Sequence, residues 1–398
     1  MVSETESYIR EHRTDDVRRL ALSSHPAGVD MQYALTQISG WQVARTKVPL
    51  WAQADGIIYP RHLSLEQCTS QYVAQYKAGF VENLLGSGFS MADFTGGMGI
   101  DCFFISRNAG RTVYCEIQPE LCELARRNFA VLGRPDIEVI NGDSPSLSGD
   151  SPRRMFDLIY LDPARRDDSG RKLVSISDCR PDAVAMQEDL KAMARYVMVK
   201  LSPMLDMKRA LSEMKNVRQV LVISLEGECK EMTLLIDRGF SGETVISAID
   251  IDRYGKPGMM ISSTHGMDIS LPLPLTDGIS PGDFICEPHA ALMKSGLFRT
   301  LAKETGTSIL HPDTHLFHSR EIRPDFPGRV FRLVQAIPFD KRGTAPLLKC
   351  RANVSVRNFP LSATQLQQKL KTSDGGSRYL CGCTTADGSK VILDMERI

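Results

Sequence analysis

Asp93 and the three glycines that follow it, Gly96, Gly97 and Gly99, have the types and spacing of a ligand-binding turn. A short apolar stretch leads into Asp93, and the residues from Ile100 onward can form a helix. Glycine permits a sharp turn and lets a ligand approach the main chain closely, and the first N–H groups of a helix are unpaired. The pattern predicts a strand, a turn that binds a polar ligand, and a helix.

Further acidic residues follow apolar stretches along the chain. Glu116 ends one such stretch and lies about 20 residues after the glycine turn, where nucleotide-binding βαβ units place a carboxylate on ribose hydroxyls. Asp162 ends another stretch and precedes Pro163, and Asp143 follows a third through Asn-Gly. Because parallel strands end at one edge of a sheet, we expect these carboxylates to converge there.

The glycine turn differs from two common phosphate-binding motifs. Its order is Gly-Gly-x-Gly with an aspartate ahead of it, not the Gly-x-Gly-x-x-Gly of dinucleotide enzymes. The chain also has no Gly-Lys-Ser or Gly-Lys-Thr, which a P-loop requires. The pattern therefore requires no pyrophosphate site.

Taken together, these motifs resemble those of the class I S-adenosylmethionine-dependent methyltransferases. The resemblance covers residues 64–236: 93–99 match the first motif, Glu116 the second-strand acid, 141–143 the third-strand turn and 162–165 the fourth motif. It implies a doubly wound, Rossmann-like α/β sheet, S-adenosyl-L-methionine as cofactor, and an enzyme that transfers a methyl group.

The resemblance also implies roles for individual residues. Asp93 would accept from the cofactor's ammonium group, Glu116 from both ribose hydroxyls, and Asp143 from the adenine amino group. The residues expected to bind the cofactor are Asp93, Thr95, Gly96, Gly97, Gly99, Asp101, Glu116, Ile117, Asp143, Ser70 and Lys77. Ordinary roles remain open, since a strand-end carboxylate can cap a helix or face solvent, and Asn-Gly is a common turn pair.

The fourth motif bears on the methyl acceptor, and we expect Asp162, Pro163 and Arg165 to act there. Methyl transfer depends mostly on positioning, and an amine acceptor must also be oriented and lose a proton. Enzymes that methylate base amino groups often carry Asp/Asn-Pro-Pro-aromatic, whereas this chain has Ala164-Arg165 after the proline. The segment 159–163 also resembles the site strand of ribosomal guanine-N2 methyltransferases. Carbon methylation through a cysteine is disfavoured, since residues 201–203 supply none.

Composition sets further bounds on function. The chain has 48 basic residues (Lys and Arg) and 48 acidic residues (Asp and Glu), so its net charge does not indicate nucleic-acid binding. Residues 281–398 differ, because they hold 17 basic against 11 acidic residues. The ten cysteines include no C-x-x-C pair and His311-x-x-x-His315 lacks supporting ligands, so we expect reduced thiols and no metal. Without an apolar signal segment or membrane span, we expect a cytoplasmic protein that does not enter membranes.

Four regions follow from the pattern of elements: an N-terminal helical segment 1–85, a methyltransferase domain 86–270, a ferredoxin-like piece 280–325 and a THUMP-like domain 326–398. In the first region, short helices are expected at 14–23 and 29–36, and a helix at 64–77 capped by Ser64. Trp41 and Trp51 are expected to fix this segment to the core; base stacking is the alternative. In the last regions, a helix at 290–303 and strands at 330–336, 348–356 and 391–395 indicate a small α+β unit.

Two motifs of this C-terminal unit, 326–329 (Phe-Pro-Gly-Arg) and 356–360 (Val-Arg-Asn-Phe-Pro), resemble the THUMP-like tail of a group of bacterial methyltransferases. Residues 285–289 (Ile-Cys-Glu-Pro-His) resemble the ferredoxin-like piece that precedes this tail. THUMP domains bind RNA, commonly transfer RNA. The resemblance therefore implies an RNA partner, tRNA or rRNA, held by the C-terminal unit.

The sequence favours an RNA methyltransferase that acts on a base nitrogen, guanine N2-like. Two alternatives remain open. One is a methyltransferase for a small molecule or a protein side chain, with the tail as a lid. The other is a catalytically silent module that binds cofactor or RNA, since fold does not fix function.

Overall fold

The computed structural model describes residues 3–23, 26–60, 68–142, 155–165, 175–266 and 278–398. The chain divides into two compact units. The first consists of Met1–Arg218, Thr233–Gly242 and Arg253–Gly255, and the second of Gln219–Met232, Glu243–Asp252 and Lys256–Ile398. The four regions expected from the sequence stay predictions beside this division.

Parallel strands form the centre of the first unit. They are β1 (Ser90–Asp93), β2 (Arg111–Glu116), β3 (Glu138–Asn141), β4 (Phe156–Leu161) and β7 (Ala194–Leu201). Their order is β7-β4-β1-β2-β3, and each neighbouring pair is parallel. Leu158, Ile159 and Leu161 of β4 are fully buried, as in strands that are covered on both faces. The expected doubly wound α/β sheet is confirmed.

Four more strands complete a nine-stranded sheet. They are β8 (Val217–Leu225), β9 (Glu228–Asp237), β10 (Val245–Ile251) and β11 (Ile261–Thr264), and the full order is β11-β10-β8-β9-β7-β4-β1-β2-β3. β10 pairs in parallel with β8 and antiparallel with β11. Separately, β5 (Ala164–Arg165), the last two residues of the fourth motif, pairs antiparallel with β6 (Cys179–Arg180).

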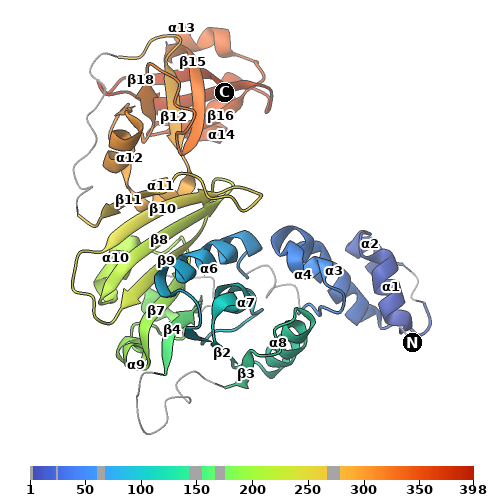
Figure 1. Ribbon diagram of the computed structural model, residues 1–398. Helices are drawn as coiled ribbons and strands as arrows, with labels where there is room; N and C mark the ends of the chain where they lie inside the picture. The colour runs from blue at the N-terminus through green and yellow to red at the C-terminus, as the bar shows by residue number, and fades with distance from the viewer. Residues whose placement is uncertain (1–2, 24–25, 61–67, 143–154, 166–174, 267–277) are drawn as a thin grey trace. The chain divides into compact units, whose positions relative to one another are not determined.

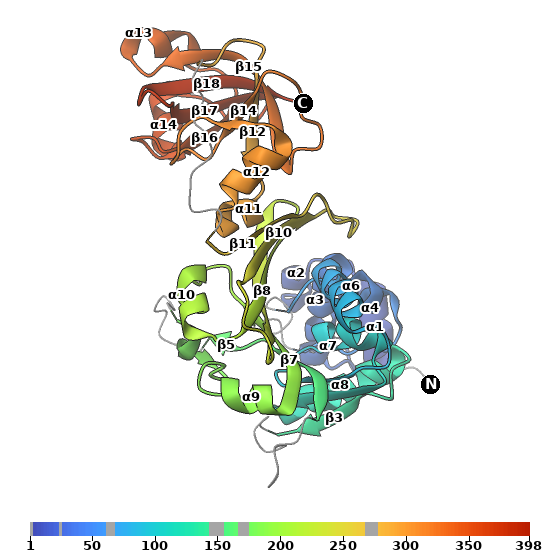
Figure 2. The same ribbon diagram turned by 60° about the vertical axis from the view of Figure 1, so that its left-hand side comes forward.

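Helices lie on both sides of the parallel strands, with α6 and α7 on one side and α9 and α10 on the other (Figure 2). The helices of this region are α6 (Gln71–Leu85), α7 (Ile100–Ile105), α8 (Pro119–Val131), α9 (Gln187–Met193) and α10 (Met207–Glu213). The sequence of α8 explains its position. Pro119 stands in the first turn, where its missing N–H is not needed, and Leu121, Ala125 and Phe129 recur every four residues on the buried face.

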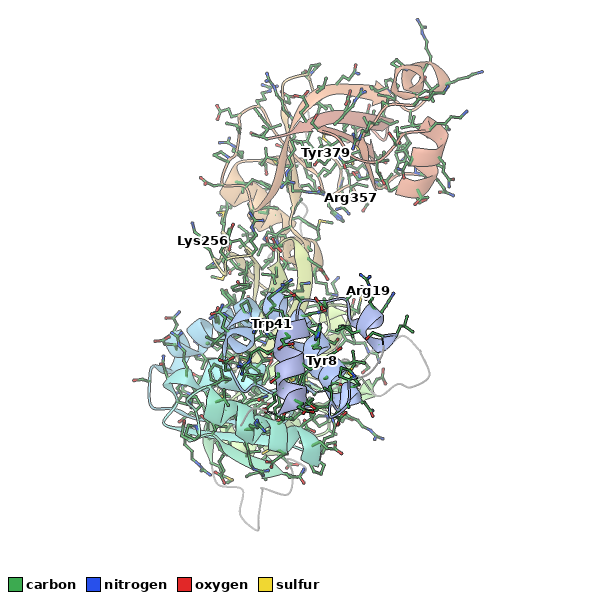
Figure 3. The ribbon with its side chains drawn as sticks, turned by 90° about the vertical axis from the view of Figure 1, so that its right-hand side faces the viewer. Tyr8, Arg19, Trp41, Lys256, Arg357 and Tyr379 are labelled. Carbon is green, nitrogen blue, oxygen red and sulfur yellow. The ribbon has the colours of Figure 1, made fainter. Side chains whose placement is uncertain are left out.

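The N-terminal segment is more helical than expected. It contains α1 (Glu4–His12), α2 (Val17–Ala21), α3 (Met31–Lys47) and α4 (Pro49–Gln53), seen in blue in Figure 1. The sequence analysis missed α1, whose polar residues form no buried face, and ended α3 too early. Trp51 is fully buried with residues of α6 and α7, including Ala74 and Phe104, and Trp41 (Figure 3) packs against the same cluster. Both tryptophans therefore fix the segment to the core, as predicted.

The helix predicted at 64–77 begins later and is longer. The structure starts α6 at Gln71, with Ser70 as N-cap, and continues it to Leu85. Cys68 and Thr69 are therefore not helical, and the predicted cap Ser64 lies outside the described residues. The correction matters because it places Thr69 and Ser70 in the loop that enters the helix.

The C-terminal unit holds a seven-stranded sheet of order β13-β14-β12-β15-β18-β17-β16. Its strands are β12 (Phe284–Pro288), β13 (Ser308–Ile309), β14 (Phe317–Ser319), β15 (Gly328–Pro338), β16 (Asn353–Arg357), β17 (Arg378–Thr384) and β18 (Lys390–Arg397). Its helices are α11 (Ala290–Ser295), α12 (Phe298–Thr305), α13 (Lys341–Thr344) and α14 (Ala363–Leu370). The expected α+β character is confirmed.

Two expectations for this unit were wrong in detail. The helix at 290–303 is two helices, because Gly296 adopts a φ of +72° and ends α11. The strand at 348–356 begins only at Asn353, since the chain turns at residues 348–349, where Lys349 has a φ of +62°. The sequence analysis also missed β17, whose Gly382 lies against Phe359 and Leu366 where a larger side chain would clash.

The described part of the chain contains neither a helix suited to span a membrane nor a cluster of potential metal ligands. None of its helices combines the length and apolar character needed to cross a membrane. No three His, Cys, Asp or Glu side chains in that part come together as a group that could hold a metal ion.

Candidate active site

The carboxyl ends of the central strands bring Asp93, Glu116 and Asp162 to the same edge of the sheet. Asp93 of β1 pairs in register with Tyr114 of β2 on one side and with Tyr160 of β4 on the other. Glu116 therefore ends β2 beside the glycine turn, and Asp162 follows β4 directly. Open parallel sheets bind ligands outside this edge.

The glycines are required by the local packing as well as by any ligand. Gly97 and Gly99 have φ values of +54° and +77°, which L-residues other than glycine rarely adopt. A Cβ on Gly96 would lie 2.3 Å from the ring of Tyr114, whose hydroxyl donates to the Gly97 carbonyl oxygen at 2.6 Å. The ring of Tyr114 therefore supports the turn from below.

Glu116 binds the turn from the neighbouring strand. Its carboxylate accepts from the main-chain N–H of Gly97 and of Gln118, both at 2.9 Å. The Asn141 side-chain amide donates to the Glu116 carbonyl oxygen at 2.9 Å, which links the end of β3 to the end of β2. Next to it, Ile117 is 67% exposed, an apolar surface at a polar edge.

Asp93 is buried under the turn and linked to the fourth motif. Its Oδ1 accepts from the N–H of Thr95 at 2.9 Å, and the Thr95 hydroxyl accepts from the N–H of Asp162 at 2.6 Å. Burial raises the pKa of Asp93 to about 7, assisted by the nearby charges of Asp101 and Asp162 and opposed by the Thr95 hydrogen bond. Thr95 therefore couples the position of one carboxylate to that of the other.

Lys200, at the end of β7, is a site residue that the sequence analysis missed. Its Nζ lies 2.5 Å from Asp162 Oδ2 and donates to the Thr69 hydroxyl at 3.0 Å. The Asp162 side chain remains 37% exposed, whereas that of Lys200 is 12% exposed. A single lysine in an apolar strand does not stand out in the sequence. Its position near the end of a predicted strand was the one feature that could have indicated a role at the site.

Lys77 and Asp101 form an internal ion pair behind this edge. Lys77 Nζ lies 2.8 Å from Asp101 Oδ1, and its side chain is 0% exposed. Asp101 Oδ2 accepts from the hydroxyls of Thr69 and Tyr160, at 2.6 and 2.8 Å. Burial would raise the pKa of Asp101, but the charges of Lys77 and Lys200 outweigh it and lower the pKa.

This pairing gives Lys77 and Asp101 a structural role. Both side chains are enclosed in the protein and paired with each other, and their expected contact with the cofactor stays a prediction. Their contribution is to hold Thr69, and through Thr69 the ammonium of Lys200, next to Asp162.

Ser70 remains available for a ligand. Its hydroxyl oxygen is buried and has no hydrogen-bond partner among the residues that the structure describes, although Ser70 is the N-cap of α6. Buried polar groups are normally paired, and the expected contact of Ser70 with the cofactor stays a prediction. Of the other predicted residues, Asp143 and the side chain of Arg165 lie outside the described part, and Pro163 is buried after Asp162.

Cys68 directly precedes Thr69, which contacts both Asp101 and Lys200. Burial raises its pKa to about 11, opposed by the charges of Lys47 and Lys200. It is therefore a neutral thiol at pH 7 and a poor nucleophile.

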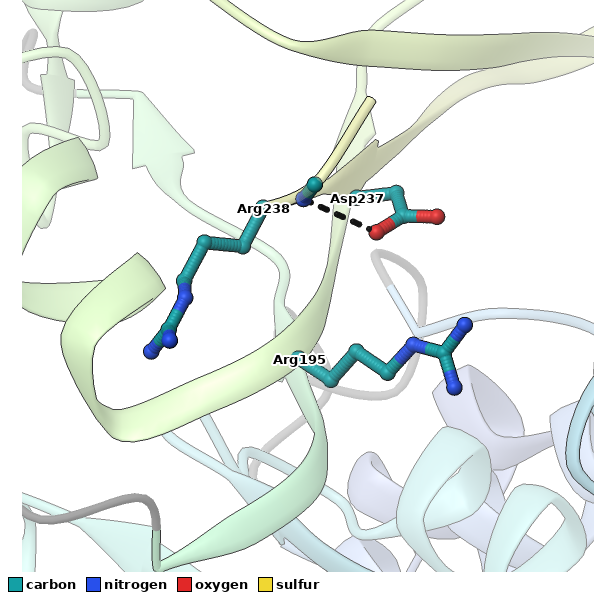
Figure 4. A pocket seen from close by; sticks show the side chains of 4 residues that line it. Arg195, Asp237 and Arg238 are labelled. Carbon is teal, nitrogen blue, oxygen red and sulfur yellow. Dashed lines mark hydrogen bonds between the residues drawn. The ribbon is translucent and has the colours of Figure 1, made fainter.

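A separate hollow of about 250 Å³ lies elsewhere in the first unit. It is lined by Arg195, Asp237, Arg238 and Gly239, with the Gly239 N–H donating to Asp237 Oδ1 at 3.1 Å (Figure 4). Arg195 stands near the start of β7, whereas Lys200 stands near its end. The hollow is therefore at the opposite edge of the sheet from the acidic residues.

Comparisons with known proteins agree with this geometry. A ferredoxin-like domain family matches residues 284–327, and a THUMP domain-like family matches residues 328–397. An uncharacterized S-adenosylmethionine-dependent methyltransferase of Mycobacterium tuberculosis (strain H37Rv) is 24% identical over 331 residues, which cover 82% of this chain and 84% of the relative.

A solved structure matches over nearly the whole length. The crystal structure of a "putative methyltransferase" from Porphyromonas gingivalis W83 is 31% identical, covers 98% of this chain and 96% of its own, and has a TM-score of 0.83. The chain therefore belongs to the class I S-adenosylmethionine-dependent methyltransferases that carry a C-terminal THUMP-like domain, and S-adenosylmethionine is its cofactor.

Proposed function

We propose that this methyltransferase acts on a nitrogen of an RNA base, in the manner of the guanine-N2 enzymes, and that its C-terminal unit holds the RNA. The observation that carries the proposal is the THUMP domain-like match on residues 328–397 in a chain with a methyl-donor site. The remaining support comes from the residues around Asp162.

The residues at the sheet edge fit the polar groups of the cofactor. S-adenosylmethionine supplies the methyl group on a sulfonium, and it also carries an amino acid, a ribose and an adenine. In our proposal, Asp93 accepts from the ammonium group, and the unpartnered hydroxyl of Ser70 binds the carboxylate. The buried position of Asp93 strengthens such a contact, because screening by water is weak there.

The ribose and adenine fit the ends of β2 and β3. Glu116 already accepts two main-chain N–H groups, which hold its carboxylate in one orientation for the ribose hydroxyls. The exposed side chain of Ile117 provides an apolar contact for the adenine ring. Asp143, which follows the end of β3, is assigned to the adenine amino group.

The acceptor is assigned to Asp162 and Pro163. Asp162 accepts a hydrogen bond from the acceptor amine, and Pro163 stiffens the main chain so that a carbonyl oxygen can accept as well. Lys200 binds one carboxylate oxygen of Asp162 and leaves the side chain partly exposed. The amine is thereby oriented with its lone pair free for the methyl group.

The methylated nitrogen carries a positive charge and must lose a proton. In our proposal the carboxylate of Asp162, held in place by Lys200, stabilises the charge that develops on the nitrogen. The proton then leaves to water after methyl transfer. Positioning and charge stabilisation are therefore the main contributions of the protein.

The proposal is tested with RNA from cells that lack this protein. The purified enzyme and tritiated S-adenosylmethionine should transfer label to that RNA but not to RNA from wild-type cells. Nucleoside mass spectrometry should then identify one methylated base that is missing without the protein. Transfer to small molecules or proteins of the lysate, with none to RNA, would contradict the RNA assignment and leave the methyltransferase assignment intact.

A further inference from the structure

Three C-terminal motifs that the sequence analysis singled out meet at one carboxylate. Glu287 belongs to β12, Arg329 to β15 and Arg357 to β16, and all three lie in the second unit. Each is the charged residue of its motif, within 285–289, 326–329 and 356–360 respectively. The three motifs therefore come together in the folded unit, although they lie far apart in the sequence.

The two carboxylate oxygens of Glu287 bind different arginines. Arg329 donates from Nε and Nη2 to Glu287 Oε2, at 3.0 and 2.5 Å, and Arg357 donates from Nη2 to Oε1 at 2.7 Å. Glu287 pairs with Arg329 across the two antiparallel strands, which fixes the spacing of this pair. Both guanidinium groups are held in defined orientations.

The arginines, not the carboxylate, face the solvent. The Glu287 side chain is 9% exposed, whereas those of Arg329 and Arg357 are 48% and 37% exposed. These three residues, the triad of Glu287, Arg329 and Arg357, carry a net positive charge. The Nε of Arg357 is buried and has no partner among the described residues, so the triad also leaves a donor unsatisfied.

Aromatic rings lie next to the triad. The guanidinium carbon of Arg329 is 5.6 Å from the centre of the Phe331 ring, and the Phe331 and Tyr379 rings are 5.1 Å apart. Arg357 and Tyr379, labelled in Figure 3, come from the adjacent parallel strands β16 and β17. Phe331 is only 3% exposed, so its ring supports Arg329 from the core and offers no face to a base. Guanidinium groups that are held in this way have the chemistry that binds backbone phosphate.

We propose that Arg329 and Arg357, oriented by Glu287, form a clamp for backbone phosphate of the RNA substrate. This inference rests on the proposed function and names the residues that carry it. Guanidinium groups bind phosphate through paired N–H donors, and arginines that are already fixed lose little conformational freedom on binding. A clamp of this kind positions RNA without reading its sequence.

The test measures RNA binding by the full-length chain. Fluorescence polarisation with an unmodified tRNA transcript and with an rRNA fragment gives Kd for wild type, Arg329→Gln, Arg357→Gln and the double variant. Glutamine keeps a donor for Glu287, so the carboxylate is not left unpaired. We expect about tenfold weaker binding for each single variant, and a salt dependence of log Kd whose slope falls by about one for each arginine.

Arg332→Gln is the matched control. Arg332 is exposed on the same strand, three residues beyond Arg329, and side chains at an odd separation point to opposite faces of a strand. The Arg332→Gln substitution removes the same charge, and the Kd for RNA should stay within about twofold of the wild-type value. An equal loss with Arg332→Gln would overturn the clamp, because general attraction to positive charge would then suffice.

Glu287→Gln separates the clamp from simple charge attraction. It raises the positive charge of the triad but releases the guanidinium groups from their carboxylate. The clamp predicts weaker RNA binding, and charge attraction predicts tighter binding. Thermal melts of every variant show whether the fold is kept.

The outcomes for the two proposals differ. If wild type binds no RNA at low salt, the proposed RNA function fails and the clamp fails with it. If wild type binds RNA and the double variant binds it equally well, the clamp alone is overturned.

Discussion

The candidate active site and the C-terminal cluster of Glu287, Arg329 and Arg357 both pair carboxylates with cations. They differ in which partner is buried and which is exposed to solvent. At the active site the cations are enclosed, with Lys77 fully buried, and the exposed member of the Lys200 pair is the carboxylate of Asp162. In the triad the carboxylate of Glu287 is enclosed, and the guanidinium groups of Arg329 and Arg357 are exposed. The two regions therefore present opposite charges to a ligand.

The difference indicates which ligand each region suits. An exposed carboxylate beside a buried cation accepts hydrogen bonds from amines and hydroxyls, as a methyl acceptor and its donor require. Exposed guanidinium groups on a buried carboxylate donate to anions. An ion pair therefore does more than stabilise the fold, because burial of one partner decides the chemistry of the other.

The comparison is tested most severely at Asp162. Asp162→Ala should lower kcat for methyl transfer roughly 1000-fold, because it removes the group that orients the acceptor and stabilises its developing charge. Donor affinity should change less than about twofold. Radiolabel transfer and calorimetry with S-adenosylmethionine measure the two quantities. Unchanged turnover in Asp162→Ala, or in the shape-preserving Asp162→Asn, would reject this role.

The enclosed cation is tested at Lys77. Lys77→Met leaves Asp101 buried without its ion-pair partner, and we expect a loss of about 3 kcal/mol in the free energy of unfolding. Urea denaturation measures the loss. The double variant Lys77→Met/Asp101→Asn removes the buried charge and should recover part of the stability. Equal stability of Lys77→Met and wild type would show that the pair contributes little.

Binding of the methyl donor S-adenosylmethionine is tested at Glu116. Glu116→Ala removes the acceptor assigned to the ribose hydroxyls and the two hydrogen bonds to Gly97 and Gln118, so donor affinity should fall about 30-fold. Calorimetry with S-adenosylmethionine measures it. Glu138→Ala, in an exposed glutamate that opens β3, is the control and should leave affinity unchanged.

The smallest effect is a pH dependence from Asp93. Burial raises its pKa from 3.8 to about 7, so the folded protein holds a proton that the unfolded chain releases, and this group lowers stability as pH rises from about 4 to about 7. Ammonium binding needs the ionised form. Donor affinity should therefore rise up to about tenfold per pH unit below about 7 and level off above it. Calorimetry at several pH values should show this slope, and Asp93→Asn should abolish it.

Most of the fold and one half of the candidate site could be predicted from sequence. Apolar stretches that end in Asp93, Glu116 and Asp162 predicted strands, and strand ends of a parallel sheet meet at one edge whatever the details of packing. Element ends were less predictable. The start of α6 depends on the entering loop, and the break at Gly296 depends on one backbone angle.

The partners of the acidic residues could not be predicted. Lys200 and Asp162 are 38 residues apart, and Lys77 lies 24 residues before Asp101. No local pattern relates such residues, because neither spacing corresponds to a helix face or a hairpin. The sequence analysis named Lys77 and Asp101 as cofactor contacts, which stays a prediction, and it gave no sign that the two side chains pair with each other.

The sequence by itself determined the family, the sheet and the row of carboxylates at its edge, since strand periodicity and glycine turns are local properties of the chain. Only the tertiary structure decided which charges are enclosed and which remain exposed. That depends on contacts between distant residues, such as Lys200 with Asp162 and Glu287 with Arg357, and the cost of burying an unpaired charge makes those contacts obligatory.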